Sequence, residues 1–159
     1  MAGKGLLYDN LRVATSDLTE LNVAFALVGG LAVSSHTVPR MTKDVDLCLA
    51  TATDLQSEAV VRNLLHRKYK LVNAVEHVSG RLATVRVTLP ESRSVDPELD
   101  LIFCTTGIEE DVVACAESIS VFGIPIRIAS VGHLIAMKIL SESETRLTDR
   151  TLVSGRLSF

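Results

Sequence analysis

The sequence lacks any long hydrophobic run, so it offers no segment that could cross a membrane. Its longest nearly uncharged stretch, residues 24–37, contains a glycine pair, a histidine and three hydroxyl side chains, whereas a spanning helix needs about 20 apolar residues. The first ten residues hold one lysine, a short Leu-Leu-Tyr stretch and an aspartate, without the apolar region of a secretory signal. We therefore expect a cytoplasmic protein that makes no membrane contact.

Cysteine is also scarce and irregularly placed. The chain has Cys48, Cys104 and Cys115, an odd number with no Cys-x-x-Cys spacing. Each lies among apolar neighbours in the sequence, as reduced cysteines in the core of a cytosolic protein do. The pattern predicts three reduced core thiols.

An excess of positive charge is absent too. The formal net charge is −3 at pH 7, which gives no global reason to expect a nucleic acid partner. The one local basic run consists of Arg62, His66, Arg67, Lys68 and Lys70. It falls at the end of an expected helix, where the helix dipole favours cations. We interpret it first as a helix end and only second as a tRNA contact.

What the chain does have is the composition of a globular domain. Of its 159 residues 47% are hydrophobic and 22% are charged, outside the low-hydrophobicity range of disordered chains. A chain of this length can bury about two thirds of its surface, which is enough for one core. Because we find no repeat, low-complexity tract or linker, residues 1–159 are expected to form a single domain.

Helical and strand patterns alternate along the chain. Apolar spacings of three and four predict helices, and short apolar or alternating runs predict strands. The expected helices span residues 6–22, 31–36, 54–68, 108–117 and 131–140, with Asp54 as a helix cap, and the expected strands span residues 24–28, 44–50, 70–75, 82–89, 98–104, 119–122 and 124–128. This order predicts an α/β (α+β) fold with a mixed, mostly antiparallel sheet flanked by helices.

Two of these strands carry acidic residues at alternate positions. Asp44 and Asp46 begin one strand, and Glu98 and Asp100 begin another. Residues two apart in a strand point to the same face, so each pair presents its carboxylates together, with apolar residues deeper in. Such a cluster would repel itself unless it holds a hard cation, and oxygen ligands suit Mg²⁺. The competing interpretation is an exposed strand face with surface acids.

A glycine pair precedes the first acidic strand. Gly29 and Gly30 lie between an expected strand and a short helix. Backbone N–H groups at a helix start bind phosphate, and glycine lets the phosphate approach. Ser34 and Ser35, one turn on, could add hydroxyl donors. A glycine pair alone is also a common turn.

Two basic residues complete the candidate site. Lys138 is spaced with Val131, Leu134 and Ile135 on the apolar stripe of its helix, where a lysine is unfavourable unless paired. A phosphate or one of the carboxylates is a plausible partner, and a lysine extended to solvent is the alternative. Arg86 belongs to a strand expected beside the second acidic one, and it could pair with Asp100 or with phosphate.

These motifs carry a family resemblance. The segment VGG, followed about fourteen residues later by KDVDL and then by ELDLIF, resembles the polymerase β type of the nucleotidyltransferase superfamily. The ending LIAMKILSESETRLTDR looks like the AbiEii-type branch, the toxins of type IV toxin–antitoxin systems. The resemblance covers residues 25–150.

The resemblance implies a nucleotidyltransferase-like fold and specific roles. Asp44, Asp46 and Asp100 would be metal ligands, with two Mg²⁺ ions possible. The remaining implied site residues are Gly29, Gly30 and Ser34 as nucleotide contacts, Lys138 as a phosphate partner and Asp149 as a late acidic residue. The implied activity is transfer of a nucleotidyl group from an NTP to an acceptor such as tRNA, with an antitoxin protein as a possible partner.

Two other functions stay open at this point. An aminoglycoside- or lincosamide-type antibiotic nucleotidyltransferase has the same carboxylate arrangement and a small hydroxylated acceptor. A non-catalytic relic that binds nucleotide or a partner protein is the other, because Leu152 replaces a second late acid of the family pattern and the C-terminal helical region is short or missing. Among the three acids, Asp100 is the one that we expect to serve as general base.

Overall fold

The computed structural model describes residues 2–38, 42–93 and 96–147, and for residues 2–4 and 144–147 it describes the backbone alone. The helices are α1 (Ala2–Glu20), α2 (Gly29–His36), α3 (Asp54–His66), α4 (Ile108–Ala114) and α5 (Val131–Leu147). The strands are β1 (Ala24–Val28), β2 (Val45–Ala50), β3 (Lys70–Glu76), β4 (Leu82–Thr88), β5 (Leu99–Phe103), β6 (Glu117–Val121) and β7 (Ile124–Ile128). Every expected element is present.

All seven strands form one sheet in the order β3-β4-β5-β2-β1-β7-β6. Strand β2 runs parallel to β5 and antiparallel to β1, and β1 runs parallel to β7. The pairs β3–β4, β4–β5 and β6–β7 are antiparallel. The mixed, mostly antiparallel sheet predicted from the sequence is therefore confirmed.

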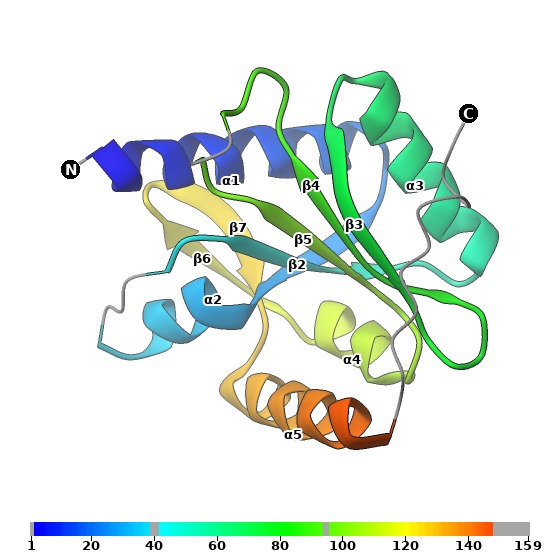
Figure 1. Cartoon of the computed structure of the whole chain (residues 1–159). Helices are drawn as coiled ribbons and strands as arrows, with labels where there is room; N and C mark the ends of the chain where they lie inside the picture. Colours follow the sequence, from blue (N-terminus) through cyan, green and yellow to red (C-terminus); the bar gives the residue numbers. More distant parts are fainter. Residues whose placement is uncertain (1, 39–41, 94–95, 148–159) are drawn as a thin grey trace.

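Helices cover both faces of the sheet (Figure 1). The larger core cluster joins α1 and α3 to sheet residues such as Leu47 and Leu101, which are fully buried. A smaller cluster on the opposite face joins α4 and α5 to Cys48 and its neighbours. Since side chains alternate along a strand, the acid Asp46 points to the same face as Cys48, which α4 and α5 only partly cover.

Two sequence expectations are corrected. Thr53, not Asp54, caps α3, because its hydroxyl accepts from Gln56 N, while the Asp54 carboxylate accepts from Leu82 N at 2.6 Å. Cys48 and Cys104 are buried as expected, but Cys115 is exposed. It follows α4 directly, at a helix end that faces solvent.

The basic run at the end of α3 has a structural role. Arg67 Nη1 donates to Asp17 and Glu20 of α1 at 2.6 and 2.7 Å, and the Tyr69 hydroxyl donates to Asp17 at 2.6 Å. These contacts tie α3 to α1, which agrees with the first interpretation of the run. None of the described helices has both the length and the apolar character needed to cross a membrane.

Replacing Thr53 by alanine should lower the free energy of unfolding by about 1 kcal/mol, because Gln56 N loses its side-chain acceptor. Urea denaturation measures this change. Thr53→Ser keeps the hydroxyl and should retain most of the stability. Equal losses in the two variants would show that the hydroxyl does not cap α3.

Candidate active site

The two acidic strands lie side by side at the centre of the sheet. Strands β2 and β5 are paired in parallel so that Asp46 stands directly opposite Asp100. Asp44 and Glu98 precede the two strands, and Glu98 N donates to Asp44 Oδ1 at 3.3 Å. The register thus sets Asp46 beside Asp100, with Asp44 at the same end of the two neighbouring strands.

Arg86 completes this cluster from β4. It is the cross-strand partner of Asp100, and its Nε and Nη2 donate to the two Asp100 oxygens at 2.7 Å each. Its Nη1 also lies 3.0 Å from Glu98 Oε2. A bidentate pair of this kind is geometrically specific. Of the two partners left open for Arg86, the structure shows Asp100.

Asp46 is the acid of this cluster whose pKa is clearly raised. Burial, followed by the negative charges of Asp100 and Asp44, raises its pKa to about 6. Arg86 and a hydrogen bond from Gly30 N act in the opposite direction. Desolvation and like charge both disfavour the ionised form of Asp46. A cation bound beside it would therefore stabilise the ionised carboxylate.

Gly29 and Gly30 make room for side chains that lie against the start of α2. Gly29 begins α2 with φ +66°, and a side chain there would collide with Asp46 Oδ2. A side chain at Gly30 would lie 2.7 Å from Thr42 Cγ2. The sequence suggested that the pair serves an incoming phosphate. The structure adds that the absence of a side chain at Gly29 admits the Asp46 carboxylate against the backbone, whereas at Gly30 it makes room for Thr42.

The serines and His36 of α2 are placed as follows. Ser35 Oγ donates back to Leu31 O at 2.9 Å, so it satisfies its own helix. Ser34 lies one turn after the glycines and is half-buried. His36 is exposed at the end of the helix, and its Nε2 lies 2.9 Å from Ala129 O.

Lys138 does not lie where its spacing predicted. Its side chain is 74% exposed and pairs with Glu142 across one helical turn at 3.4 Å. The stripe that it shares is itself open to solvent, since Val131 and Ile135 are 50% and 57% exposed. Periodicity alone cannot show whether an apolar stripe is covered. Asp149 lies outside the described residues.

Within the described part of the chain, no group of three or more His, Cys, Asp or Glu side chains is gathered closely enough to hold a metal ion. Both Asp100 oxygens are directed toward the Arg86 guanidinium. The donors are nevertheless carboxylate oxygens, the ligands that Mg²⁺ uses, and Arg86 is 40% exposed and so has space to move.

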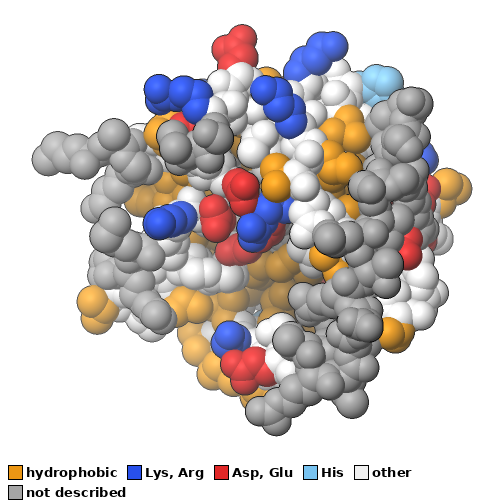
Figure 2. All heavy atoms as spheres, in the orientation of Figure 1, with side chains coloured by type: hydrophobic (Ala, Val, Ile, Leu, Met, Phe, Trp, Pro, Cys, Tyr) orange, Lys and Arg blue, Asp and Glu red, His pale blue; other side chains and the backbone are white. Residues whose placement is uncertain are grey.

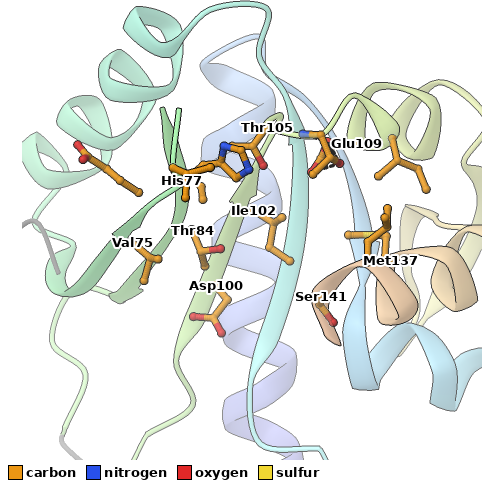
Figure 3. Close-up of a pocket in the computed structure, with 15 residues that line it drawn as sticks. Val75, His77, Thr84, Asp100, Ile102, Thr105, Glu109, Met137 and Ser141 are labelled. Atoms are coloured by element: carbon orange, nitrogen blue, oxygen red, sulfur yellow. Dashed lines mark hydrogen bonds between the residues drawn. The ribbon is translucent and has the colours of Figure 1, made fainter. Parts of the chain in front are cut away.

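Figure 2 shows acidic and basic side chains gathered near the middle of this face, with a hydrophobic hollow between them and α5. The hollow belongs to a cavity of about 240 Å³ that Asp100 helps to line. In Figure 3, Asp100, Thr84 and Val75 lie on the sheet side of the cavity, and Met137 and Ser141 face it from α5. No sequence pattern indicates this cavity, because its walls come from five separate elements.

Solved structures share this architecture. The fold is nucleotidyltransferase-like. The lincosamide antibiotic adenylyltransferase LnuA, bound to lincomycin, aligns with a TM-score of 0.55 and 12% identity over 80% of this chain and 83% of that one.

Two further structures agree. A nucleotidyltransferase candidate from Thermotoga maritima gives a TM-score of 0.52 and 13% identity over 87% of this chain and 91% of its own. An antigenic nucleotidyltransferase-like protein from Paracoccidioides brasiliensis gives 0.50 and 18% identity over 89% and 72%. No protein-family model and no curated protein sequence matches the chain. At these identities the likeness shows the fold.

Asp46→Asn should stabilise the metal-free protein at neutral pH. The native carboxyl binds its proton more tightly than the unfolded one, so the stability of the native state falls as pH rises from about 4 to 6. The neutral amide removes this loss, worth up to about 3 kcal/mol above pH 6. Urea denaturation at pH 4 and pH 8, with a chelator, measures it. A variant less stable than the native chain at pH 8 contradicts the assigned cause.

Gly29→Ala should destabilise the chain more than Gly80→Ala does. Both residues have positive φ, +66° and +78°, but only at Gly29 would the new side chain meet Asp46, whereas nothing lies within 4 Å at Gly80. We expect about 1 kcal/mol from backbone strain at Gly80 and a clearly larger loss at Gly29. Denaturation midpoints compare the two variants, and equal losses would mean that Asp46 does not lie against the turn.

Proposed function

We propose that this chain is a cytoplasmic, metal-dependent nucleotidyltransferase that moves a nucleotidyl group from an NTP to a hydroxyl acceptor. The observation that carries the proposal is the parallel register of β2 and β5, which sets Asp46 beside Asp100 opposite the Gly29–Gly30 turn. The nucleotidyltransferase-like fold supports it.

Asp44, Asp46 and Asp100 are the residues proposed to hold Mg²⁺. Their oxygens are hard donors, and the raised pKa of Asp46 marks negative charge that the protein itself does not fully compensate. When bound, one or two Mg²⁺ ions would supply stabilisation of the charge on the attacking and leaving oxygens. Arg86 must leave at least one oxygen of Asp100 for this arrangement to form.

Helix α2 is proposed to receive the phosphates of the NTP. Its first turn directs backbone N–H groups outward beside Asp46, and its dipole favours negative charge. Gly29, Gly30 and Ser34 remain the proposed nucleotide contacts, although Gly30 N already donates to Asp46. Lys138 is the proposed phosphate partner by resemblance. Its exposed pair with Glu142 is of a kind that contributes little and exchanges readily.

The same acidic cluster offers a group that can take the proton of the acceptor hydroxyl. The acceptor oxygen attacks the α-phosphorus, pyrophosphate leaves, and the hydroxyl proton passes to a carboxylate. Asp100 is our proposed base. Since Arg86 engages both of its oxygens, Asp100 can take the proton only after Arg86 has moved, and the freed guanidinium is then available to phosphate.

The identity of the acceptor distinguishes a toxin from an antibiotic-modifying enzyme. An AbiEii-like toxin, with an antitoxin partner, would modify tRNA, whereas an antibiotic-type enzyme would modify a small hydroxylated molecule. The name of LnuA gives a lincosamide as the substrate of that enzyme. Arg67, one member of the basic run that could contact tRNA, is engaged by Asp17 and Glu20 of α1.

The proposal is tested by incubating the protein with each labelled NTP, Mg²⁺, and a pool of tRNA and small hydroxylated acceptors. Asp46→Asn should reduce label transfer by about 100-fold or more, because a charge-stabilising group is lost at the reacting centre. Asp111→Asn, which alters an exposed acid of α4, serves as the matched control and should retain full activity.

Two results would contradict the proposal. Transfer that survives Asp46→Asn unchanged would place the chemistry elsewhere. Binding of Mg²⁺ and NTP by the native chain without any transfer would instead identify the non-catalytic relic.

A further inference from the structure

A row of polar side chains crosses four strands on the face of the sheet that carries the acids. Asp46 of β2 is the register partner of Asp100 of β5, and Asp100 is the partner of Arg86 of β4. Arg86 is in turn the partner of Asn73 of β3. Residues directly opposite each other on antiparallel strands point to the same face, with Cβ atoms about 4.5–5.5 Å apart. Arg86 therefore stands between an acid on one side and an amide on the other.

Arg86 uses only one of these two neighbours. Its Nε and Nη2 donate to Asp100, and its Nη1 lies 3.0 Å from Glu98 Oε2. On the other side, Asn73 Oδ1 is buried and accepts a hydrogen bond from no residue that the structure describes. Folded proteins leave few buried carbonyl oxygens without a donor. Asn73 thus offers Arg86 an acceptor that its present position leaves unused.

An irregularity in β3 is what places Asn73 opposite Arg86. The register of β3 against β4 shifts between Leu71 and Asn73, where Val72 is an extra residue. Without this shift, Val72 would oppose Arg86, and Asn73 would oppose Val85, which is fully buried in the core on the other face. Extra residues of this kind re-aim a side chain and are frequent beside active sites. The local backbone therefore directs an amide, in place of a valine, to the side of Arg86.

The proposed metal site needs Arg86 to release Asp100. An ion held by Asp46 and Asp100 competes with the guanidinium for the same oxygens. A displaced guanidinium loses charge-assisted hydrogen bonds, and the ion repels it while it stays nearby. Asn73 lies on the side of Arg86 away from Asp100. A bond to its Oδ1 replaces part of what is lost and takes the positive charge away from the acids.

We propose that Asn73 is a positioning residue of the active site, which accepts a hydrogen bond from Arg86 when a divalent cation takes Asp100. This role rests on the proposed function, because it concerns how the same acids accept their metal ion. Arg86 and the cation exchange at Asp100, and Asn73 favours the exchange by holding the displaced guanidinium. Since a guanidinium has five N–H donors, the bond to Asn73 leaves others for phosphate.

The first test uses the metal-free chain. Asn73→Val removes a buried oxygen that has no donor and places a residue that favours strands, so it should unfold at the same urea concentration as the native chain or at a higher one. Asn73→Thr has the shape of valine and restores an oxygen acceptor, which makes it the matched control. A clearly lower midpoint for Asn73→Val would show that the amide is already engaged without metal and would overturn the proposal.

The second test measures Mn²⁺ affinity without NTP, from the electron paramagnetic resonance signal of free Mn²⁺. Asn73→Val should weaken binding about threefold or more, because the displaced Arg86 loses a hydrogen bond, and Asn73→Thr should weaken it less. Arg86→Gln removes the competing cation and should tighten binding about fivefold or more. Unchanged affinity in Asn73→Val, or weaker binding in Arg86→Gln, would overturn the exchange.

The double variant shows whether Asn73 acts through Arg86. In the Arg86→Gln chain, Asn73→Val should leave Mn²⁺ affinity unchanged, since the guanidinium that Asn73 holds is gone. An equal loss of affinity with and without Arg86 would give Asn73 a merely structural role and would contradict the proposal.

The role of Asn73 and the proposed function fail differently. Equal Mn²⁺ affinity in the native chain and Asn73→Val, with label transfer from NTP intact, would overturn the role of Asn73 and leave nucleotidyl transfer standing. The predicted order of affinities in a chain that transfers label to nothing would overturn the proposed function and leave the exchange at Asp100 standing. An absence of Mn²⁺ binding even in Arg86→Gln would overturn both.

Discussion

The Asp46 carboxylate lies partly buried between two other acids and a helix start, and most features of this face follow from accommodating it. Desolvation and the charges of Asp100 and Asp44 raise its pKa to about 6. Gly29 has no side chain at the one position where it would collide with the carboxylate. Arg86 offsets part of the repulsion by binding Asp100. Acids whose pKa is raised in this way cluster at functional sites, and this is why the catalytic proposal begins from Asp46.

The two faces of the sheet differ in how completely helices cover them. One face is closed by α1 and α3 over a core that includes Leu47 and Leu101. On the other, α4 and α5 cover the deeper parts of β2 and β5, as the burial of Cys48 shows, and the acids at the starts of these strands stay outside this cover. The catalytic proposal concerns this partly covered face, with α2 on one side and the cavity on the other.

The sequence predicted the fold well because each element had a local signal. Alternation along β2 and β5 placed Asp46 and Asp100 on one face, and their register then made them neighbours. Local patterns could not show what long-range packing decides. The apolar spacing around Lys138 predicted a covered stripe, but only Leu134 of that stripe packs against the core, while Val131 and Ile135 are exposed. The cavity needs five elements that meet only in the folded chain. The role of Gly29 in admitting Asp46 likewise depends on a contact between separate segments.

A crystal structure of the chain with Mn²⁺ and a non-hydrolysable NTP analogue tests the central claim most directly. The anomalous signal of Mn²⁺ should lie between the carboxylates of Asp44, Asp46 and Asp100, with the phosphates at the start of α2 and with Arg86 withdrawn from at least one Asp100 oxygen. A metal and nucleotide bound elsewhere, while Arg86 still holds both oxygens of Asp100, would contradict it.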